Sequence, residues 1–154
     1  MKAWIWGAAV LALVGCGDDG GKDSSDTSED TQGGHGAGGT HDLSTEVMSD
    51  GGSFMVSYMP SVDPIPLSEP FDLTVMVADA TSGDMVMGAD LTFAATMPDH
   101  GHGMNTEPAI TANADGSFTV TGMLFHMEGW WMMTAGITVD SSTEMAMFNH
   151  TCCQ

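Results

Sequence analysis

Residues 108–125 read PAITANADGSFTVTGMLF, a sequence that indicates a β-fold. Two runs of alternating apolar and polar residues flank the pair Asp115-Gly116. Alternation with a period of two indicates half-buried strands, and Asp-Gly between two such runs is a strong hairpin signal. The stretch therefore predicts two antiparallel strands joined by a tight turn.

Similar runs recur through the rest of the chain, separated by Gly, Pro, Asp and Asn at intervals of about ten residues. β-Branched and aromatic residues fill these runs, and no window of eleven or more residues keeps a helical period. The predicted strands are residues 53–59, 70–79, 89–96, 108–112, 117–125, 131–139 and 143–149. Seven short strands, with a Trp entering a late one, predict an all-β fold, an immunoglobulin-like β-sandwich of antiparallel strands.

The same alternation predicts the core, because every second side chain of a strand faces the opposite sheet. A domain of roughly 110 residues suffices for one modest core of this kind. The side chains assigned to it are Phe71, Leu73, Val75, Val77, Leu91, Phe93, Ala95, Phe118, Val120, Leu124, Trp131, Met133, Ile137 and Val139.

The N-terminus has the pattern of a secretory signal. Lys2 precedes an uncharged stretch from Ala3 to Val14 that is too short to span a membrane, since a spanning helix needs about 20 residues. Residues 13–16, Leu-Val-Gly-Cys, resemble the lipobox of bacterial lipoproteins, in which the Cys is acylated and becomes the first mature residue. We therefore expect a lipoprotein signal peptide over 1–15 and a lipid on Cys16 that anchors the protein in the bacterial cell envelope. An ordinary cleaved signal peptide is the alternative, and it also leads out of the cytoplasm.

Residues 16–42 are rich in Gly, Ser and Asp and have no aromatic side chain, which predicts a flexible acidic tether. His35 and His41 lie in this tether and are expected to be solvated spacer residues. The remaining residues, 43–154, form the predicted β-sandwich domain.

The charge balance excludes several functions. The chain has 21 Asp and Glu against two Lys and no Arg, a formal net charge of -19, so it lacks the basic groups that nucleic-acid binding requires. It also lacks a glycine-rich phosphate loop. The domain from Leu43 onward holds 14 of the acidic residues and no Lys or Arg. Such a surface draws cations toward it, although a saline habitat favours the same composition.

Metal-binding side chains concentrate in residues 97–105, which read MPDHGHGMN. Imidazole and thioether groups together suit copper, because sulfur favours Cu(I) and imidazole accepts either oxidation state. His100 and His102 are two residues apart, so an extended backbone points both side chains to one side.

Strand order predicts what surrounds this loop. Consecutive antiparallel strands alternate between the two ends of a sandwich, so this loop, the segment after Phe125 and the segment after Asn149 fall at one end. All four histidines of the domain then lie there, with the C-terminal cysteines. The candidate copper ligands, for Cu(I) or Cu(II), are His100 and His102 first, then Met104 and His126, then Met127 and Met97.

Other interpretations of these residues remain open. Met97 continues the parity of a buried run, which favours packing, and His126 fits a hydrogen-bonded histidine at the core edge. Trp130 fits either a ring over a bound cation or a surface cap. For Cys152 and Cys153, a vicinal or intermolecular disulfide is favoured over metal ligation.

From Phe71 to about Met147 the chain resembles the YtkA-like family of small extracytoplasmic β-sandwich domains. The resemblance rests on FDLTVMVAD, GADLTFAATMP, the DHGHGM loop followed by Pro108, DGSFTVTGM, and HMEGWW at the family's Met-x-Gly-x-Trp turn. It implies an immunoglobulin-like fold and metal handling in the cell envelope. Met97, Pro98 and Met104 match the family's loop, Met127, Gly129 and Trp131 match its turn, and His100, His102 and His126 depart from its pattern.

The sequence does not favour an enzyme. It has no nucleophile elbow, and although His100, His102 and His126 could hold a catalytic zinc ion, no carboxylate is clearly placed as a general base. We therefore expect a membrane-tethered, extracytoplasmic copper-binding carrier, buffer or assembly module with an envelope protein as its transfer partner. The alternative is a structural or protein-interaction domain that binds no metal.

Overall fold

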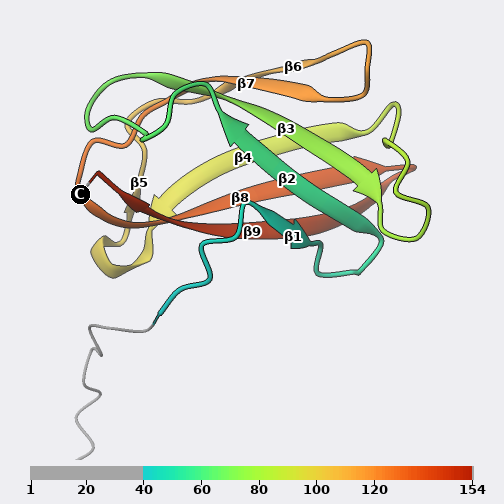
Figure 1. Ribbon diagram of the computed structural model, residues 1–154, viewed down its shortest axis with the longest axis horizontal. Coiled ribbons are helices and arrows are strands. Elements are labelled where there is room, and N and C mark those ends of the chain that lie inside the picture. Colours follow the sequence, from blue (N-terminus) through green and yellow to red (C-terminus); the bar gives the residue numbers. More distant parts are fainter. Residues whose placement is uncertain (1–39, 154) are drawn as a thin grey trace, which may run out of the picture. The chain divides into compact units, whose positions relative to one another are not determined.

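A computed structural model of the chain describes residues 40–153 (Figure 1). These residues lie in a compact unit that runs from Gly38 to Gln154 and has its own hydrophobic core. The predicted signal peptide, Cys16, His35 and most of the tether lie outside the described residues. Within residues 40–153, no helix is long and apolar enough to cross a membrane.

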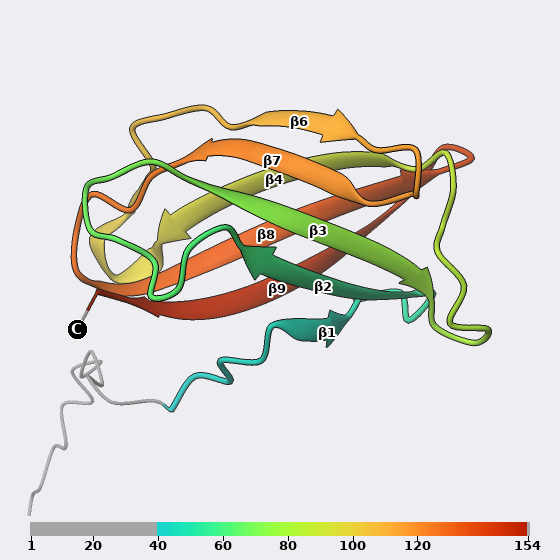
Figure 2. The same ribbon diagram turned by 45° about the horizontal axis from the view of Figure 1, so that its top comes forward.

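The described residues form an all-β fold of two antiparallel sheets, which confirms the predicted sandwich (Figures 1 and 2). One sheet has the order β1-β2-β3-β7-β6 and the other has the order β5-β4-β8-β9. The strands are β1 (Glu46–Met48), β2 (Phe54–Pro60), β3 (Phe71–Asp79), β4 (Asp90–Met97), β5 (His102–Gly103), β6 (Ala109–Ala112), β7 (Phe118–Met123), β8 (Gly129–Val139) and β9 (Ser142–Cys152), and the 3-10 turn η1 covers Pro98–His100.

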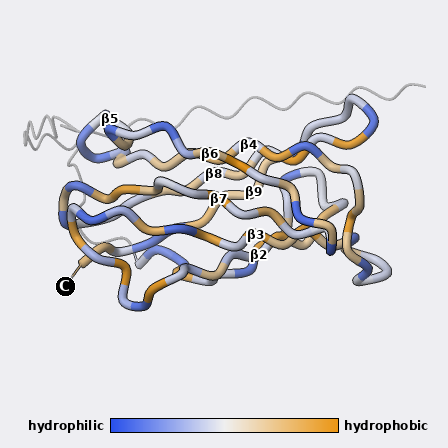
Figure 3. Tube along the Cα trace, turned by 90° about the horizontal axis from the view of Figure 1, so that it is seen from above, coloured by the Kyte–Doolittle hydropathy of each residue, from blue (hydrophilic) through white to orange (hydrophobic). Residues whose placement is uncertain are grey.

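All seven predicted runs are strands, and two short strands were not predicted. β1 has three residues and pairs with β2, and β5 has two residues inside the histidine loop and pairs with the end of β4. Neither is long enough to show an alternating pattern in the sequence. The hydropathy colouring in Figure 3 places most hydrophilic segments in the connections at both ends of the sheets.

The hairpin predicted at residues 108–125 is present in the structure. β6 and β7 pair in register from Ala109 opposite Thr121 to Ala112 opposite Phe118. The Asp115 carboxylate accepts hydrogen bonds from the backbone N–H and the hydroxyl of Ser117. Gly116 has φ 87°, a conformation that favours glycine over residues with a Cβ atom.

Most of the predicted core is buried between the sheets, but the prediction for Leu124 was wrong, since its side chain is only half-buried. Phe71 pairs with Met123 while Leu73 pairs with Val120, so β7 contains one extra residue, a β-bulge, and Gly122 there has φ 81°. A bulge reverses the side-chain alternation beyond it. Phe125 is therefore buried in place of Leu124. Val139, the last residue of β8, is half-buried and packs against the core.

Candidate metal centre

Three segments that are distant in sequence meet at one end of the sandwich, which we call the histidine end: residues 97–104, residues 124–130 and residues 149–153 (Figures 1 and 2). β4 and β7 run toward this end, and β9 finishes there. Strand connectivity thus brings the predicted ligand-bearing segments together, and side-chain packing sets their final arrangement.

His100, His102 and His126 form a row of imidazoles, which we call the histidine row. The ring centroids of His100 and His102 are 5.8 Å apart, and those of His102 and His126 are 5.1 Å apart. Imidazole nitrogens bind a metal ion at about 2 Å, which puts each ring centroid about 3 Å from the ion and two bound rings about 5 Å apart. The observed spacings therefore suit rings that share an ion.

The hydrogen bond of His102 assigns its tautomer. Its Nδ1 lies 3.1 Å from the carbonyl oxygen of Gly103, and a carbonyl can only accept a hydrogen bond, so Nδ1 carries the proton. The lone pair is then on Nε2, where a metal ion can bind. A backbone carbonyl on the other ring nitrogen is a common way to orient a metal-binding histidine.

His126 has a buried ring nitrogen with no partner. Its Nδ1 forms no hydrogen bond to any described residue, although the side chain as a whole is half-buried. Buried polar atoms are rarely unpaired, because each one loses its hydration without compensation. The interpretation of His126 as a hydrogen-bonded histidine at the core edge therefore does not fit, whereas a bound cation would satisfy this nitrogen.

Trp131 supports two members of the row. Its ring centroid lies 5.5 Å from that of His126 and 6.3 Å from that of His102, with the rings near perpendicular at 77° and 73°. Trp131 is fully buried, and its Nε1 donates a 3.0 Å hydrogen bond to the carbonyl oxygen of Met127. A rigid aromatic residue thus fixes the segment that carries His126.

Met97 packs in the core, as the alternation of its strand predicts, and also reaches the histidine end. It is fully buried and pairs with His102 across β4 and β5. Its Cε would lie only 3.3 Å from a Cβ atom at position 129, which is glycine. The absence of a side chain at Gly129 leaves room for Met97, so its thioether is placed next to the histidine row.

The other two candidate thioethers are less suited to bind a metal ion. The Met104 sulfur accepts a 3.4 Å hydrogen bond from the backbone N–H of Leu124, which ties the two loops together. The Met127 side chain is exposed, and the residue contributes to the site through its carbonyl group. Their assignment as ligands stays a prediction.

In the part of the chain that the structure describes, no three His, Cys, Asp or Glu side chains already stand at ligating positions. The imidazoles are near one another but their planes are tilted by 40° and 33°, so metal binding needs ring rotations. His100 is exposed on η1, beside Gly101 with φ 68°, and is the member of the row with the most freedom to turn.

His150 lies apart from the row, so the four domain histidines do not form one cluster. Phe125 stacks on Trp131 with a centroid distance of 4.6 Å and an interplanar angle of 14°. His150 packs against Phe125 at 5.7 Å, whereas the row packs against Trp131. The stacked pair therefore separates His150 from the row.

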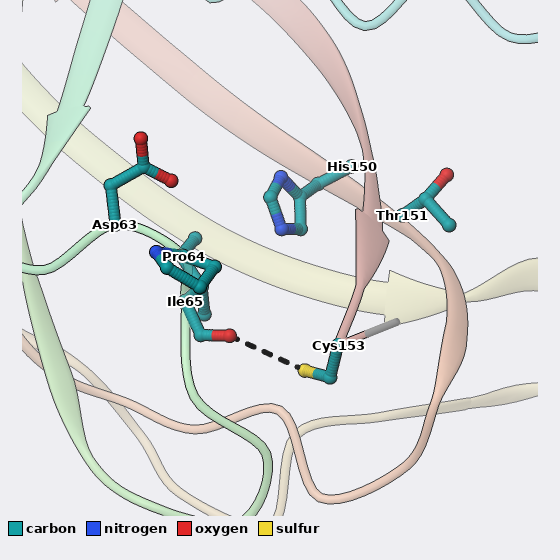
Figure 4. Close-up of a pocket in the computed structure, with 6 residues that line it drawn as sticks. All are labelled: Asp63, Pro64, Ile65, His150, Thr151 and Cys153. Atoms are coloured by element: carbon teal, nitrogen blue, oxygen red, sulfur yellow. Dashed lines mark hydrogen bonds between the residues drawn. The ribbon is translucent and has the colours of Figure 1, made fainter.

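His150 lines a cavity of about 280 Å³, which we call the thiol cavity (Figure 4). Burial lowers the pKa of His150, and the nearby Asp63 carboxylate opposes this effect only in part, which favours a neutral imidazole. Cys152 and Cys153 are joined by a disulfide at the same strand end. The residues that line the cavity are Asp63, Pro64, Ile65, His150, Thr151 and Cys153.

His41 is not a free spacer residue. Its ring stacks on Trp130 with a centroid distance of 3.8 Å and an interplanar angle of 11°. The Trp130 Nε1 donates to the Asn149 side-chain oxygen, and the Asn149 amide donates to the Asp42 carbonyl oxygen. The outer face of Trp130 is therefore covered by the chain itself, and no sequence signal indicated this contact.

A YtkA-like family model matches residues 61–136. These residues form a YtkA-like domain. The match confirms the resemblance seen in the sequence and includes all three members of the histidine row. His150, Cys152 and Cys153 lie beyond the matched residues.

The solved structures that are similar to this chain include two of FetP of uropathogenic Escherichia coli. One is a copper-bound variant, with 9% identity and a TM-score of 0.47, and the similarity covers 71% of this chain and 94% of that one. The other is the protein as isolated after expression in the periplasm, with 9% identity, a TM-score of 0.47 and coverage of 70% and 91%. No curated protein matches the chain.

Proposed function

We propose that this protein is an extracytoplasmic copper-binding module whose histidine row holds the ion. The observation that carries the proposal is the buried Nδ1 of His126, which has no partner among the described residues and belongs to a row of imidazoles 5.1 and 5.8 Å apart. A bound cation would satisfy this nitrogen and draw the three rings toward one point.

Each member of the row would have its own role. His102 is oriented by the Gly103 carbonyl and His126 by its packing on Trp131, so these two would form the fixed part of the site. His100 is exposed and would meet an incoming ion first. The Met97 thioether, buried beside the row, would favour Cu(I), while the imidazoles also accept Cu(II).

The setting supports a carrier, buffer or assembly module rather than a catalyst. The domain has 14 acidic residues and no Lys or Arg, so its field favours the approach of cations. The signal pattern that ends at Cys16 supports a lipid anchor in the cell envelope, where the module would exchange copper with a partner protein. A row with an exposed outer member suits such an exchange.

The test is an anaerobic titration of residues 38–154 with Cu(I) and with Cu(II), in the disulfide form. Wild-type protein should bind one equivalent, and the His100→Ala/His102→Ala variant should bind at least about tenfold more weakly, because it keeps one imidazole of three. His41→Ala, which removes an imidazole outside the row, is the matched control and should bind like wild type. Equal uptake by the double variant and wild type would instead favour the metal-free interaction domain.

A further inference from the structure

The C-terminal end of β9 places three further metal-binding groups next to one another. His150 and Cys152 are two residues apart on the strand, so both side chains face inward, while Thr151 between them is exposed. Two residues of strand span about 6.6 Å, which long or rotatable side chains can bridge. Cys153 follows with φ 74°, a turn that redirects the chain at this point.

The thiol cavity gives His150 and Cys153 a common space, and Cys152 is bonded to Cys153 beside it (Figure 4). The His150 ring lines the cavity from β9, Cys153 lines it from just beyond that strand, and Asp63 and Ile65 line it from the β2–β3 connection. The Cys153 Sγ lies 3.5 Å from the Ile65 carbonyl oxygen. A second cavity of about 280 Å³ also contains His150 and Asp63, and extends to Tyr58. The cavity is therefore roomy enough for an ion and its ligands.

We propose that reduction of the Cys152–Cys153 disulfide creates a second copper site, in which the two cysteine sulfurs and His150 bind one Cu(I) ion. Thiolate sulfur is the ligand that selects Cu(I) most strongly. Structural zinc sites take four protein ligands, and this strand end offers three soft or nitrogen donors. The site is separate from the histidine row, because the stacked Phe125 and Trp131 rings lie between them.

The Cys152–Cys153 disulfide would be reduced by thiol–disulfide exchange. An extracytoplasmic dithiol attacks the Cys152–Cys153 bond, gives it two electrons and two protons, and leaves as a disulfide. The two cysteine thiols then bind Cu(I) and release their protons to solvent. In the disulfide form neither sulfur carries the negative charge that binds the ion, so the site exists only after reduction.

The test separates this site from the histidine row. The His100→Ala/His102→Ala variant of residues 38–154 is prepared in the disulfide form, and a second sample is reduced with dithiothreitol and desalted without oxygen. Cu(I) is titrated against a chromophoric chelator. The reduced sample should bind one tight equivalent that the disulfide sample lacks, and wild type should gain one equivalent on reduction. Failure of the histidine row would remove only the equivalent that is independent of reduction.

Two further variants test whether His150 binds the Cu(I) ion together with the two cysteines. His150→Ala in the reduced sample should weaken Cu(I) binding at least about tenfold, whereas Met147→Ala, on the outer side of the same strand and outside the cavity, should leave it unchanged. Equal Cu(I) uptake before and after reduction would overturn the proposal. So would unchanged affinity in His150→Ala, since the thiols alone would then account for the binding, or the absence of two new thiols after reduction of the folded protein.

Discussion

At the end of the sandwich opposite the histidines, acidic side chains are bound by neighbouring hydroxyl and amide groups, whereas the histidines have few partners. Glu144 accepts hydrogen bonds from the hydroxyls of Ser49 and Ser53 and from the Ser53 backbone N–H. These bonds lower the pKa of Glu144, Ser49 contributing most. At the histidine end, the buried Nδ1 of His126 has no partner in residues 40–153.

The difference indicates what each end does. At the opposite end, polar side chains close turns, as Asp79 does for Thr81 and Ser82 and as Asp115 does for Ser117. Such groups are satisfied within the protein and serve stability. A polar group that the fold buries without a partner lowers stability, and a ligand that binds it restores the loss. We therefore propose that the histidine end serves binding, and three comparisons of variants test this contrast.

The largest effect on stability is expected at Trp131, which packs both in the core and against the histidine row. Trp131→Ala should lower the free energy of unfolding by about 3–5 kcal/mol, because the ring is fully buried and stacks on Phe125. Trp130→Ala removes the adjacent ring from the outer face and should cost less than half as much. Urea unfolding measures both. Equal losses would contradict the assignment of Trp131, rather than Trp130, to the core.

The second prediction contrasts one substitution at each end. His126→Leu should leave the free energy of unfolding within about 0.5 kcal/mol of wild type, or raise it, because an unpaired buried nitrogen disappears. The same variant should bind copper at least about tenfold more weakly. Ser49→Ala should lower stability by about 1 kcal/mol, since it removes partners of Glu144 and of the Phe54 N–H.

These two variants are compared by thermal unfolding without metal and by copper titration. Ser49→Ala should bind copper like wild type, which makes it the matched control for His126→Leu. If His126→Leu is clearly destabilised while its copper affinity is unchanged, His126 is a structural residue and the contrast between the ends fails.

The smallest expected effect is the pH dependence of the stability that Glu144 contributes at the opposite end. The pKa of Glu144 is held below its usual value of 4.5 in the folded protein, so its contribution to stability is complete above that value. This contribution is lost as the pH falls through the lowered pKa. Glu144→Gln should therefore lower the melting temperature by a few degrees at neutral pH and by less at strongly acidic pH. Glu107→Gln, an exposed control, should follow the wild-type curve; a uniform effect of Glu144→Gln at all pH values would argue against these bonds.

Much of the fold follows from local pattern. Alternation is visible wherever one face of a strand is buried, and antiparallel connections then assign the loops to an end. The burial of Phe125 in place of Leu124 was not predicted, because it depends on one extra residue in β7 that reverses the alternation of side chains. The only sign of this bulge in the sequence of the strand is Gly122. Reading that glycine as a bulge would have placed Phe125 in the core.

The location of the candidate site could be predicted from the sequence. The separation of His150 from the other three histidines, and the covering of Trp130, could not. Loop composition and strand order bring His100, His102 and His126 to one end, as the structure has them. The separation of His150 depends on the stacking of Phe125 on Trp131, and the cover of Trp130 depends on His41. Both are contacts between side chains that are remote in sequence, which periodicity does not encode.

Above all, we propose that the imidazoles of the histidine row bind copper together. Pulsed electron paramagnetic resonance of residues 38–154 with one equivalent of Cu(II) counts the imidazoles on the ion directly, through the couplings of their remote nitrogens. We predict couplings from three imidazoles in wild type and from only one in the His100→Ala/His102→Ala variant. The same couplings in both proteins, or none in wild type, would show that the histidine row does not bind the ion.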